Sequence, residues 1–371
     1  MAIGNQVEKC RFFIDFLQYQ YEIGNVGTVS DTNWSVGEIN AHTLGLNPTK
    51  AHESIDLGAT YDYQYFKVGF KNSINIPDAK MFISLLGHNF ASQDYTISII
   101  LYYTSDPVSD GQAWLNESIS SVTQTVDDVV NMDMQYDGWS IGSFTPSIPT
   151  NINALVIKVH NVTDGKTYKI GGVAFGSIYE PEFHADLAVT QSRIMDGIKN
   201  KQTKGGSTYS VINHLRPANW WNGSPFELKE AGNDNVSYSN ARIGRRSWDV
   251  GFSQLTDRKY TDGVPNGVFP ANEMITRDLG DAVNGGYIDG DMDIPENSAV
   301  GTFNYNINTD TSLYSTLYHH TLGGTLPFLF SPSQDNSPQN FAICRFDKPG
   351  FKVTQKSYKK FNIKMKINES W

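Results

Sequence analysis

The sequence predicts an all-β protein of two domains, a jelly-roll β-sandwich followed by a second antiparallel β domain. Three observations predict this class. Near the C-terminus, Phe361, Ile363, Met365 and Ile367 alternate strictly with polar residues, which is the pattern of a strand with one wet face. Charged residues make up only 18% of the chain while aromatic residues reach 12%, and 32 glycines interrupt it. Short apolar runs recur at regular intervals between turn residues, as in sandwiches and barrels.

The length and charge of the chain indicate its number of domains and the kinds of partner it can have. A chain of 371 residues is longer than one core usually grows, so we expect two domains, 1–183 and 184–371, divided where the character changes between Pro181 and Thr190. The net charge of −10 argues against a nucleic-acid partner. No run approaches the length of a membrane span, and the N-terminus carries no secretory signal pattern. Cys10 and Cys344 lie in no metal-binding spacing, and we expect two buried or half-buried thiols.

The first expected element is a strand over Arg11–Tyr21, whose dense aromatic residues would be buried on both faces. The polar residues from Gly24 to Thr60 indicate loops with short strands, and Trp34 among them is a candidate cover residue. The acidic segment Trp114–Met134 indicates a long loop between strands. Six further strands are expected in this half, over 64–70, 81–86, 95–104, 138–144, 154–161 and 169–178.

The segment Phe82–Pro181 resembles the galactose-binding-like jelly rolls that occur in adhesins and virion proteins. Its signals are the run Phe82-Ile-Ser-Leu-Leu-Gly-His-Asn-Phe90, the strand after Tyr95, and the closing run Gly171–Pro181. In that family, loops at one end of the sandwich often hold a glycan or a structural calcium ion. The resemblance implies the fold, and no ligand residue can be aligned one by one.

In the second half, Lys199–Gly206 reads as a flexible hairpin tip or arm, because lysines before a Gly-Gly pair favour solvent. Ser247–Ser253 alternates as a strand. Leu326–Pro338 followed by Asn340–Phe346 fits a β-meander that closes the domain. In the terminal strand, Lys364 and Lys366 occupy solvent-facing positions, which we interpret as a charged face that blunts edge pairing.

Four of these segments together resemble the tail and baseplate structural proteins of tailed bacteriophages, with the layout of a distal-tail type of β domain. They are Gly244–Phe252, Pro327–Phe330, Phe341–Phe346 and the terminal strand, and the opening run Arg11–Tyr19 is also of this kind. The resemblance implies a non-enzymatic virion component in the tail, baseplate or adaptor ring. It also implies assembly in the host cytoplasm, with other virion proteins and further copies of the chain as partners.

Trp220 and Trp221, together with Arg245 and Arg246, are the candidate interface or glycan residues. Tryptophan and arginine dominate the hot spots of protein interfaces. The tryptophan pair can also form a platform for a sugar, so a host-surface carbohydrate-binding protein is the alternative function. A protein interface is favoured over a glycan platform, because glycan sites usually need polar partners that the sequence does not place. A third interpretation has no ligand at all, with one tryptophan in the core and the other capping a loop.

Asp289, Asp291 and Asp293 are the candidate metal ligands, since they place carboxylates at alternate positions as calcium loops do. The EF-hand pattern fails because Ile294 and Val300 replace the required glycine and acidic ligand, so a solvated acidic loop is the favoured interpretation. We therefore expect no cofactor, with calcium as the ion to test.

No catalytic motif appears in the sequence, so we expect a protein that is not an enzyme. An endoglycosidase of tailspike type is a weaker alternative, because spikes show repetitive β-helix sequence that this chain lacks. His319 and His320 are adjacent, and on the strand expected there they would point to opposite faces and could not easily share one metal ion.

Overall fold

The computed structural model describes parts of both halves of the chain. The described residues are 9–31, 44–46, 52–53, 61–77, 79–90, 96–103, 121–123, 127–130, 138–146, 150–162, 169–181, 183–194, 198–212, 245–256, 268, 311–333, 341–350, 352–357 and 360–370. Among the helices in these ranges, none has the length and hydropathy needed to cross a membrane.

The larger of two main sheets has eleven strands. They are β1 Arg11–Asp15, β5 Met81–His88, β8 Asp127–Val130, β9 Gly138–Phe144, β12 Gly172–Tyr179, β13 Thr190–Ile194, β16 Arg245–Thr256, β17 Phe328–Ser331, β18 Ala342–Phe346, β19 Val353–Ser357 and β20 Lys360–Glu369. Their order is β13-β16-β20-β18-β17-β1-β12-β5-β9-β8, and β19 pairs with β20 beside this row.

The smaller main sheet has five strands in the order β2-β4-β10-β6-β7. These are β2 Val26–Asp31, β4 Tyr61–Ile74, β6 Thr96–Tyr103, β7 Ser121–Thr123 and β10 Ile152–Val162. Two separate pairs join β3 His52–Glu53 to β11 Lys169–Ile170, and β14 Ile198–Gln202 to β15 Thr208–Ile212. The pairings within the described residues are antiparallel, which confirms the predicted all-β class.

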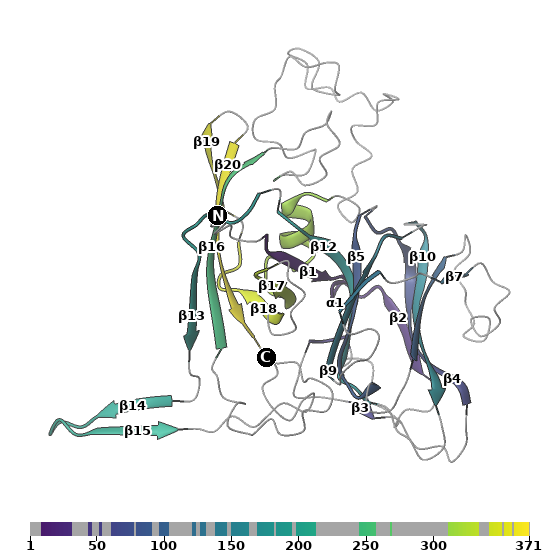
Figure 1. Cartoon of the computed structure of the whole chain (residues 1–371), viewed down its shortest axis with the longest axis horizontal. Coiled ribbons are helices and arrows are strands. Elements are labelled where there is room, and N and C mark those ends of the chain that lie inside the picture. Colours follow the sequence, from purple (N-terminus) through teal and green to yellow (C-terminus); the bar gives the residue numbers. More distant parts are fainter. Residues whose placement is uncertain are drawn as a thin grey trace, which may run out of the picture.

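One face of the large sheet carries two hydrophobic cores. At its β12–β5–β9 end this face packs against the five-stranded sheet as a β-sandwich, with Ile83, Phe175 and Ile157 in the core. At the other end the same face encloses a second core that contains Phe252 and Phe330. Figure 1 shows β1 between these two parts of the molecule.

Strand β1 makes the sheet continuous between the two halves of the sequence. It pairs with β12 on one side and with β17 on the other, so that Phe12 lies opposite both Tyr179 and Phe330. Cross-strand partners point to the same face, and the three rings meet at centroid distances of 6.3 Å and 5.1 Å from Phe12. The described residues between β12 and β13, 180–181 and 183–189, contain no strand. The predicted domain boundary at 183 lies there and remains a prediction.

The expected strand over Arg11–Tyr21 is wrong in its second half. The strand ends at Asp15, and a seven-residue helix, α1 Phe16–Glu22, follows it. Asp15 caps the helix, since its carboxylate accepts a hydrogen bond of 2.9 Å from the Leu17 backbone N–H. An aromatic run buried on both faces does not distinguish a strand from a buried helix, because neither period stands out.

The other strand predictions are largely confirmed. The terminal strand β20 buries Phe361, Ile363, Met365 and Ile367 on one face, as the alternation predicted. Lys364 and Lys366 are exposed, as predicted. Their proposed role against edge pairing remains a prediction, because β16 is the strand paired with β20 at these two positions, while β19 and β18 pair with residues 360–363 and 367–369. The segment Trp114–Met134 is not one uninterrupted loop, since it contains the short strands β7 and β8. Trp34 lies outside the described residues.

Candidate functional site

The structure describes two of the sequence-predicted site residues. Trp220 and Trp221 lie outside the described residues, as do Asp289, Asp291 and Asp293. Arg245 and Arg246 are the first two residues of β16. Of the four candidate interface residues, the structure therefore places only Arg245 and Arg246. The proposed interface role of the four residues remains a prediction.

Arg246 is buried and is held by its own chain. Its backbone N–H and its Nε both donate to the carboxylate of Glu369, and its guanidinium donates a 3.1 Å hydrogen bond to the Phe341 carbonyl oxygen. The guanidinium also stacks over the Trp248 ring, 5.1 Å from its centre. Burial raises the pKa of Glu369, and the charge of Arg246 opposes that rise. Arg246 thus joins β16 to the end of β20, and Arg245 beside it is only half-buried.

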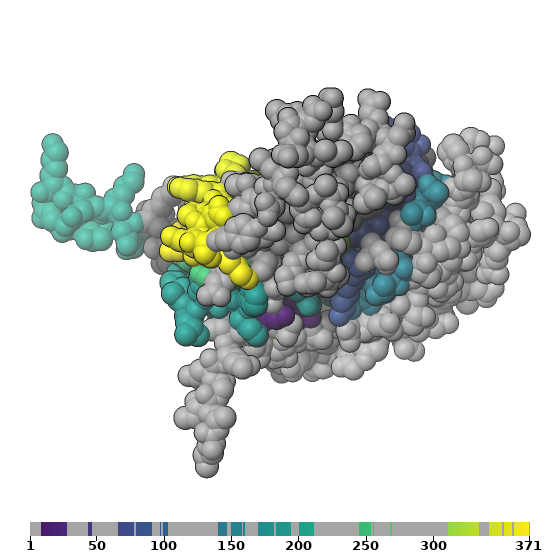
Figure 2. Space-filling model, turned by 90° about the horizontal axis from the view of Figure 1, so that it is seen from above, coloured from purple at the N-terminus to yellow at the C-terminus, as the bar shows by residue number. Residues whose placement is uncertain are grey.

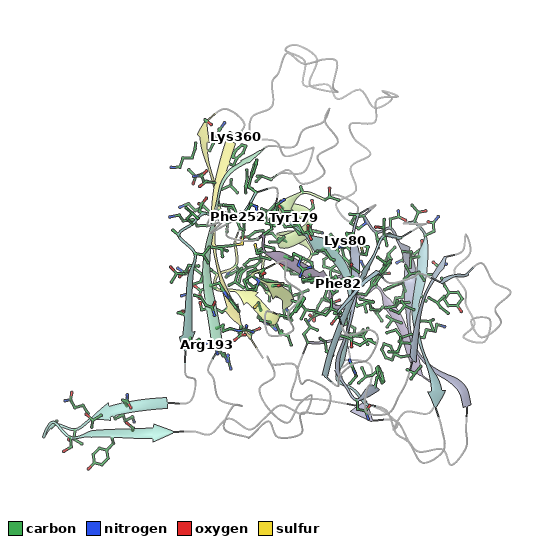
Figure 3. The ribbon with its side chains drawn as sticks, viewed as in Figure 1. Lys80, Phe82, Tyr179, Arg193, Phe252 and Lys360 are labelled. Atoms are coloured by element: carbon green, nitrogen blue, oxygen red, sulfur yellow. The ribbon has the colours of Figure 1, made fainter. Side chains whose placement is uncertain are left out.

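A projecting hairpin is the most exposed feature of the described chain. Strands β14 and β15 pair in register from Ile198 with Ile212 to Gln202 with Thr208. Every residue from Asn200 to Ser210 is exposed, and Tyr209 is 63% exposed. Figures 1 and 2 show the hairpin standing away from the described body, and Figure 3 places Arg193 at the end of β13 from which it departs.

The hairpin has a well-formed turn, as the sequence predicted for Lys199–Gly206. Thr203 holds the turn, because its backbone N–H donates to the Ser207 carbonyl at 2.8 Å and its hydroxyl accepts from the Ser207 N–H at 3.1 Å. Gly206 has φ of +85°, a conformation that L side chains rarely adopt. Ser210 donates a 2.7 Å hydrogen bond across the strands to Asn200. These contacts define the hairpin without help from the rest of the described chain.

The charge of the hairpin is opposite to that of the protein. Residues 198–212 contain Lys199, Lys201 and Lys204 and no Asp or Glu, which gives +3. Since the whole chain carries −10, the remaining residues carry −13. A cationic arm on an acidic protein favours contact with acidic surfaces.

The histidine pair belongs to a helix and not to the strand that we expected. His319 ends the π-helix η4 Tyr314–His319, and His320 follows it. The side chain of His319 shares a 2.9 Å hydrogen bond with the Tyr19 hydroxyl of α1, while His320 packs edge-on against Phe16 and Tyr19. Among the described residues, neither ring nitrogen of His320 makes a hydrogen bond of good geometry, although the Ser315 backbone interacts weakly with the ring. The two rings therefore lie side by side in the contact between α1 and η4.

Burial lowers the pKa of both histidines in this contact. It lowers the pKa of His320 to about 3, with the neighbouring His319 acting in the same direction and the Ser315 backbone against it. Burial also lowers the pKa of His319. These rings are neutral near pH 7, and we interpret them as packing residues.

Both cysteines are free and buried, which confirms the prediction of two buried thiols. Burial raises the pKa of Cys10 to about 12 and raises the pKa of Cys344 well above its ordinary value. Such thiols are poor nucleophiles at neutral pH, because the thiolate is the reactive form.

No known protein family matches the chain, and no curated protein sequence matches it. Among solved structures, a reduced XRCC1 bound to the DNA polymerase β catalytic domain is 10% identical over 41% of this chain and 97% of that one, with a TM-score of 0.27. A pectin-binding carbohydrate-binding module is 10% identical over 41% of this chain and 91% of that one, with a TM-score of 0.23. The CBM32-1, CBM32-2 and M60 domains of Clostridium perfringens ZmpB are 11% identical over 69% of this chain and 33% of that one, with a TM-score of 0.27.

Proposed function

We propose that this chain is a non-enzymatic structural component of a tailed-phage virion, in the tail, the baseplate or an adaptor ring. The observation that carries the proposal is the β14–β15 hairpin. The resemblance of Gly244–Phe252 and of the terminal strand to tail and baseplate proteins gives the setting. Assembly would take place in the host cytoplasm, with other virion proteins and further copies of this chain as partners.

The physical argument begins with the stability of an isolated hairpin. A two-stranded hairpin is at best marginally stable in water, because it buries little apolar surface. The β14 and β15 strands pair only with each other among the described residues, so each also has an outer edge that can accept another strand. Contact with a second molecule would cover these edges and bury Tyr209. The hairpin is therefore suited to joining two molecules, and it contributes little to the stability of the chain to which it belongs.

The test compares assembly of the full chain with that of a variant in which residues 199–211 are replaced by a short Gly-Ser turn. We expect mass photometry over a concentration series to show a defined ring or other oligomer for the full chain. The shortened variant should remain a monomer with an unchanged far-UV circular dichroism spectrum. If virion extract is needed for assembly, the hairpin should gain protection from protease when the extract is added.

A matched control keeps the hairpin and changes only its charge, through Lys201→Gln with Lys204→Gln. Intermediate assembly in this variant would assign part of the contact to charge, and full assembly would assign it to the strand edges. A monomeric full chain that virion extract neither assembles nor protects would contradict the proposal. Hydrolysis of a polysaccharide by the purified chain would also contradict it. Saturable glycan binding that is lost in Trp220→Ala and Trp221→Ala would instead favour the carbohydrate-binding alternative.

A further inference from the structure

A groove of about 760 Å³ lies where β16 and β20 pair, on the half of the molecule that carries the second core. Residues on β16, β20, η4, the segment before β13 and the loop after β18 line it. Figure 1 shows β16 and β20 at the outer side of this half. Its volume falls within the range of roughly 300–1,000 Å³ that is usual for small-molecule sites.

Four lysines surround this groove, namely Lys348, Lys352, Lys364 and Lys366. All four side chains are exposed, and none of them forms an ion pair or a hydrogen bond with a residue in the described ranges. The two lysines of β20 are two residues apart and thus point to the same face, about 7 Å from each other along the strand. On the side away from β16, β19 pairs with residues 360–363 of β20 and β18 pairs with residues 367–369, and the groove lies beside the residues between them.

The groove is lined by three carboxylates and four lysines, and two of the carboxylates already accept hydrogen bonds from other side chains or the backbone. Asp186 accepts from the Ser253 backbone N–H at 3.1 Å and from the Ser253 hydroxyl at 2.8 Å. Asp347 accepts a 2.8 Å hydrogen bond from Asn368. Asp249 lies opposite Lys366 in the strand register. The lining thus carries a net positive charge in a protein whose net charge is −10.

Gly251 is a lining residue of the groove and lies between Asp186 and Lys364. A Cβ atom at this position would lie 3.0 Å from the Asp186 carboxylate and 3.8 Å from the Lys364 side chain. The absence of a side chain at Gly251 lets the Asp186 carboxylate lie close against the sheet at the side of the groove. Backbone and apolar atoms of Val250, Met365 and Pro349 contribute further to the lining.

We propose that this groove binds a small anion that carries two or more phosphate or carboxylate groups. Because exposed ammonium groups lie on two sides of one groove, they can bind several oxyanion groups of one ligand at the same time, which a single surface lysine cannot do. Lys364 and Lys366 contact the anion from the strand, and Lys348 and Lys352 contact it from the loop. This binding is separate from the proposed role in assembly and does not depend on it.

The test is isothermal titration calorimetry of the full chain with pyrophosphate and citrate as probes, at low ionic strength because salt screens exposed charges. We expect saturable binding of at least one probe. The paired substitution Lys364→Gln and Lys366→Gln should weaken it about tenfold, since it removes two of the four ammonium groups. Tighter binding of pyrophosphate would identify a phosphate ligand, and tighter binding of citrate a carboxylate ligand.

The matched control is the hairpin variant Lys201→Gln with Lys204→Gln, which removes the same charge from a remote place and should bind as the unchanged chain does. Equal weakening in both variants would overturn the proposal, because net charge alone would then explain the binding. It would also be overturned by failure to bind either probe, or by equal binding of the neutral trisaccharide maltotriose. All four positions are exposed, and thermal unfolding of each variant checks that the fold is retained.

Discussion

At the scale of single residues, Gly176 determines how closely β12 can approach the first strand. A Cβ atom on Gly176 would lie 1.8 Å from the Ile14 carbonyl oxygen and 2.9 Å from the Phe16 nitrogen. Both are backbone atoms, so a larger residue requires the chain to shift where β1 gives way to α1. A glycine is needed here because of this close approach and not because of a turn.

We predict that Gly176→Ala lowers the free energy of unfolding by on the order of 3 kcal/mol, as overpacking against a fixed backbone does. Chemical denaturation measures this loss. Gly205→Ala at the hairpin tip is the control, because nothing lies within 4 Å of a Cβ atom there and its effect should be close to zero. Equal effects of the two substitutions would show that the close approach is not stabilising.

The ion pair between Arg246 and Glu369 is the second prediction at this scale. The exposed fractions of the two side chains are 7% and 0%, so removal of one partner leaves a buried charge without compensation. We predict that Glu369→Ala costs about 3–5 kcal/mol in the free energy of unfolding. The double variant Arg246→Met with Glu369→Leu should cost much less, because no charge stays buried. A cost below about 1 kcal/mol for Glu369→Ala, the value of an exposed pair, would contradict this account.

At the scale of elements, the contact between α1 and η4 should respond to acid. The pKa of His320 is lowered in the folded protein, so its stabilising effect is present above its unfolded pKa of about 6.5 and is lost as the pH falls toward about 3. Asp15 at the start of α1 acts oppositely. Its pKa is raised by burial to about 7, so its contribution is greatest at low pH and is lost as the pH rises through that value.

Because the two groups oppose each other, we predict the pH effect as a difference between variants. Relative to His320→Phe, the unchanged chain should lose about 1.4 kcal/mol of unfolding free energy for each pH unit below about 6. Denaturation at a series of pH values between about 7 and 5 measures this slope. A difference between the two proteins that does not change with pH would show that His320 is protonated as easily in the folded chain as in the unfolded one.

At this scale, the sequence was enough to predict the β14–β15 hairpin, but it was not enough to predict the change from strand to helix within Arg11–Tyr21. Lys204 and the Gly-Gly pair at positions 205–206 produce a turn through local conformational preference alone. The aromatic run Arg11–Tyr21 has no such local signal. Its division into β1 and α1 depends on Asp15, which caps the helix and also accepts a 3.3 Å hydrogen bond from the Phe175 N–H of β12.

At the scale of the whole molecule, one large sheet carries both cores. The strand β1 pairs with β12 from the first half of the sequence and with β17 from the second. A local opening of either core therefore disturbs strands that belong to the other. The two predicted domains share a continuous hydrogen-bonded sheet within the described residues.

We predict that the two halves unfold together. Ile83→Ala in the sandwich core and Phe252→Ala in the second core should each cost about 2–5 kcal/mol and shift the same transition. Tryptophan fluorescence and far-UV circular dichroism during denaturation should give coincident curves for both variants. Two separate transitions, each shifted by only one substitution, would instead show that the segments 1–183 and 184–371 are independent domains.

The sequence by itself determined the features that depend on neighbouring residues. The alternation at 361–367 specified a strand with one buried face, because a strand turns every second side chain to the same side. Turn chemistry specified the hairpin, and the placement of the cysteines outside any metal-binding spacing agreed with two buried thiols. These predictions needed no knowledge of which strands become neighbours.

Only the tertiary structure decided the features that join distant residues. Arg246 and Glu369 are 123 positions apart, and Tyr19 and His319 are 300 apart. The groove joins lysines of β20 to those of a loop after β18, and the sheet order places β1 between two halves of the chain. Such contacts are set by the competition among many possible strand pairings and by the packing of whole faces. A pattern of hydrophobic residues specifies which face is buried, but it does not specify the strand that will cover or extend it.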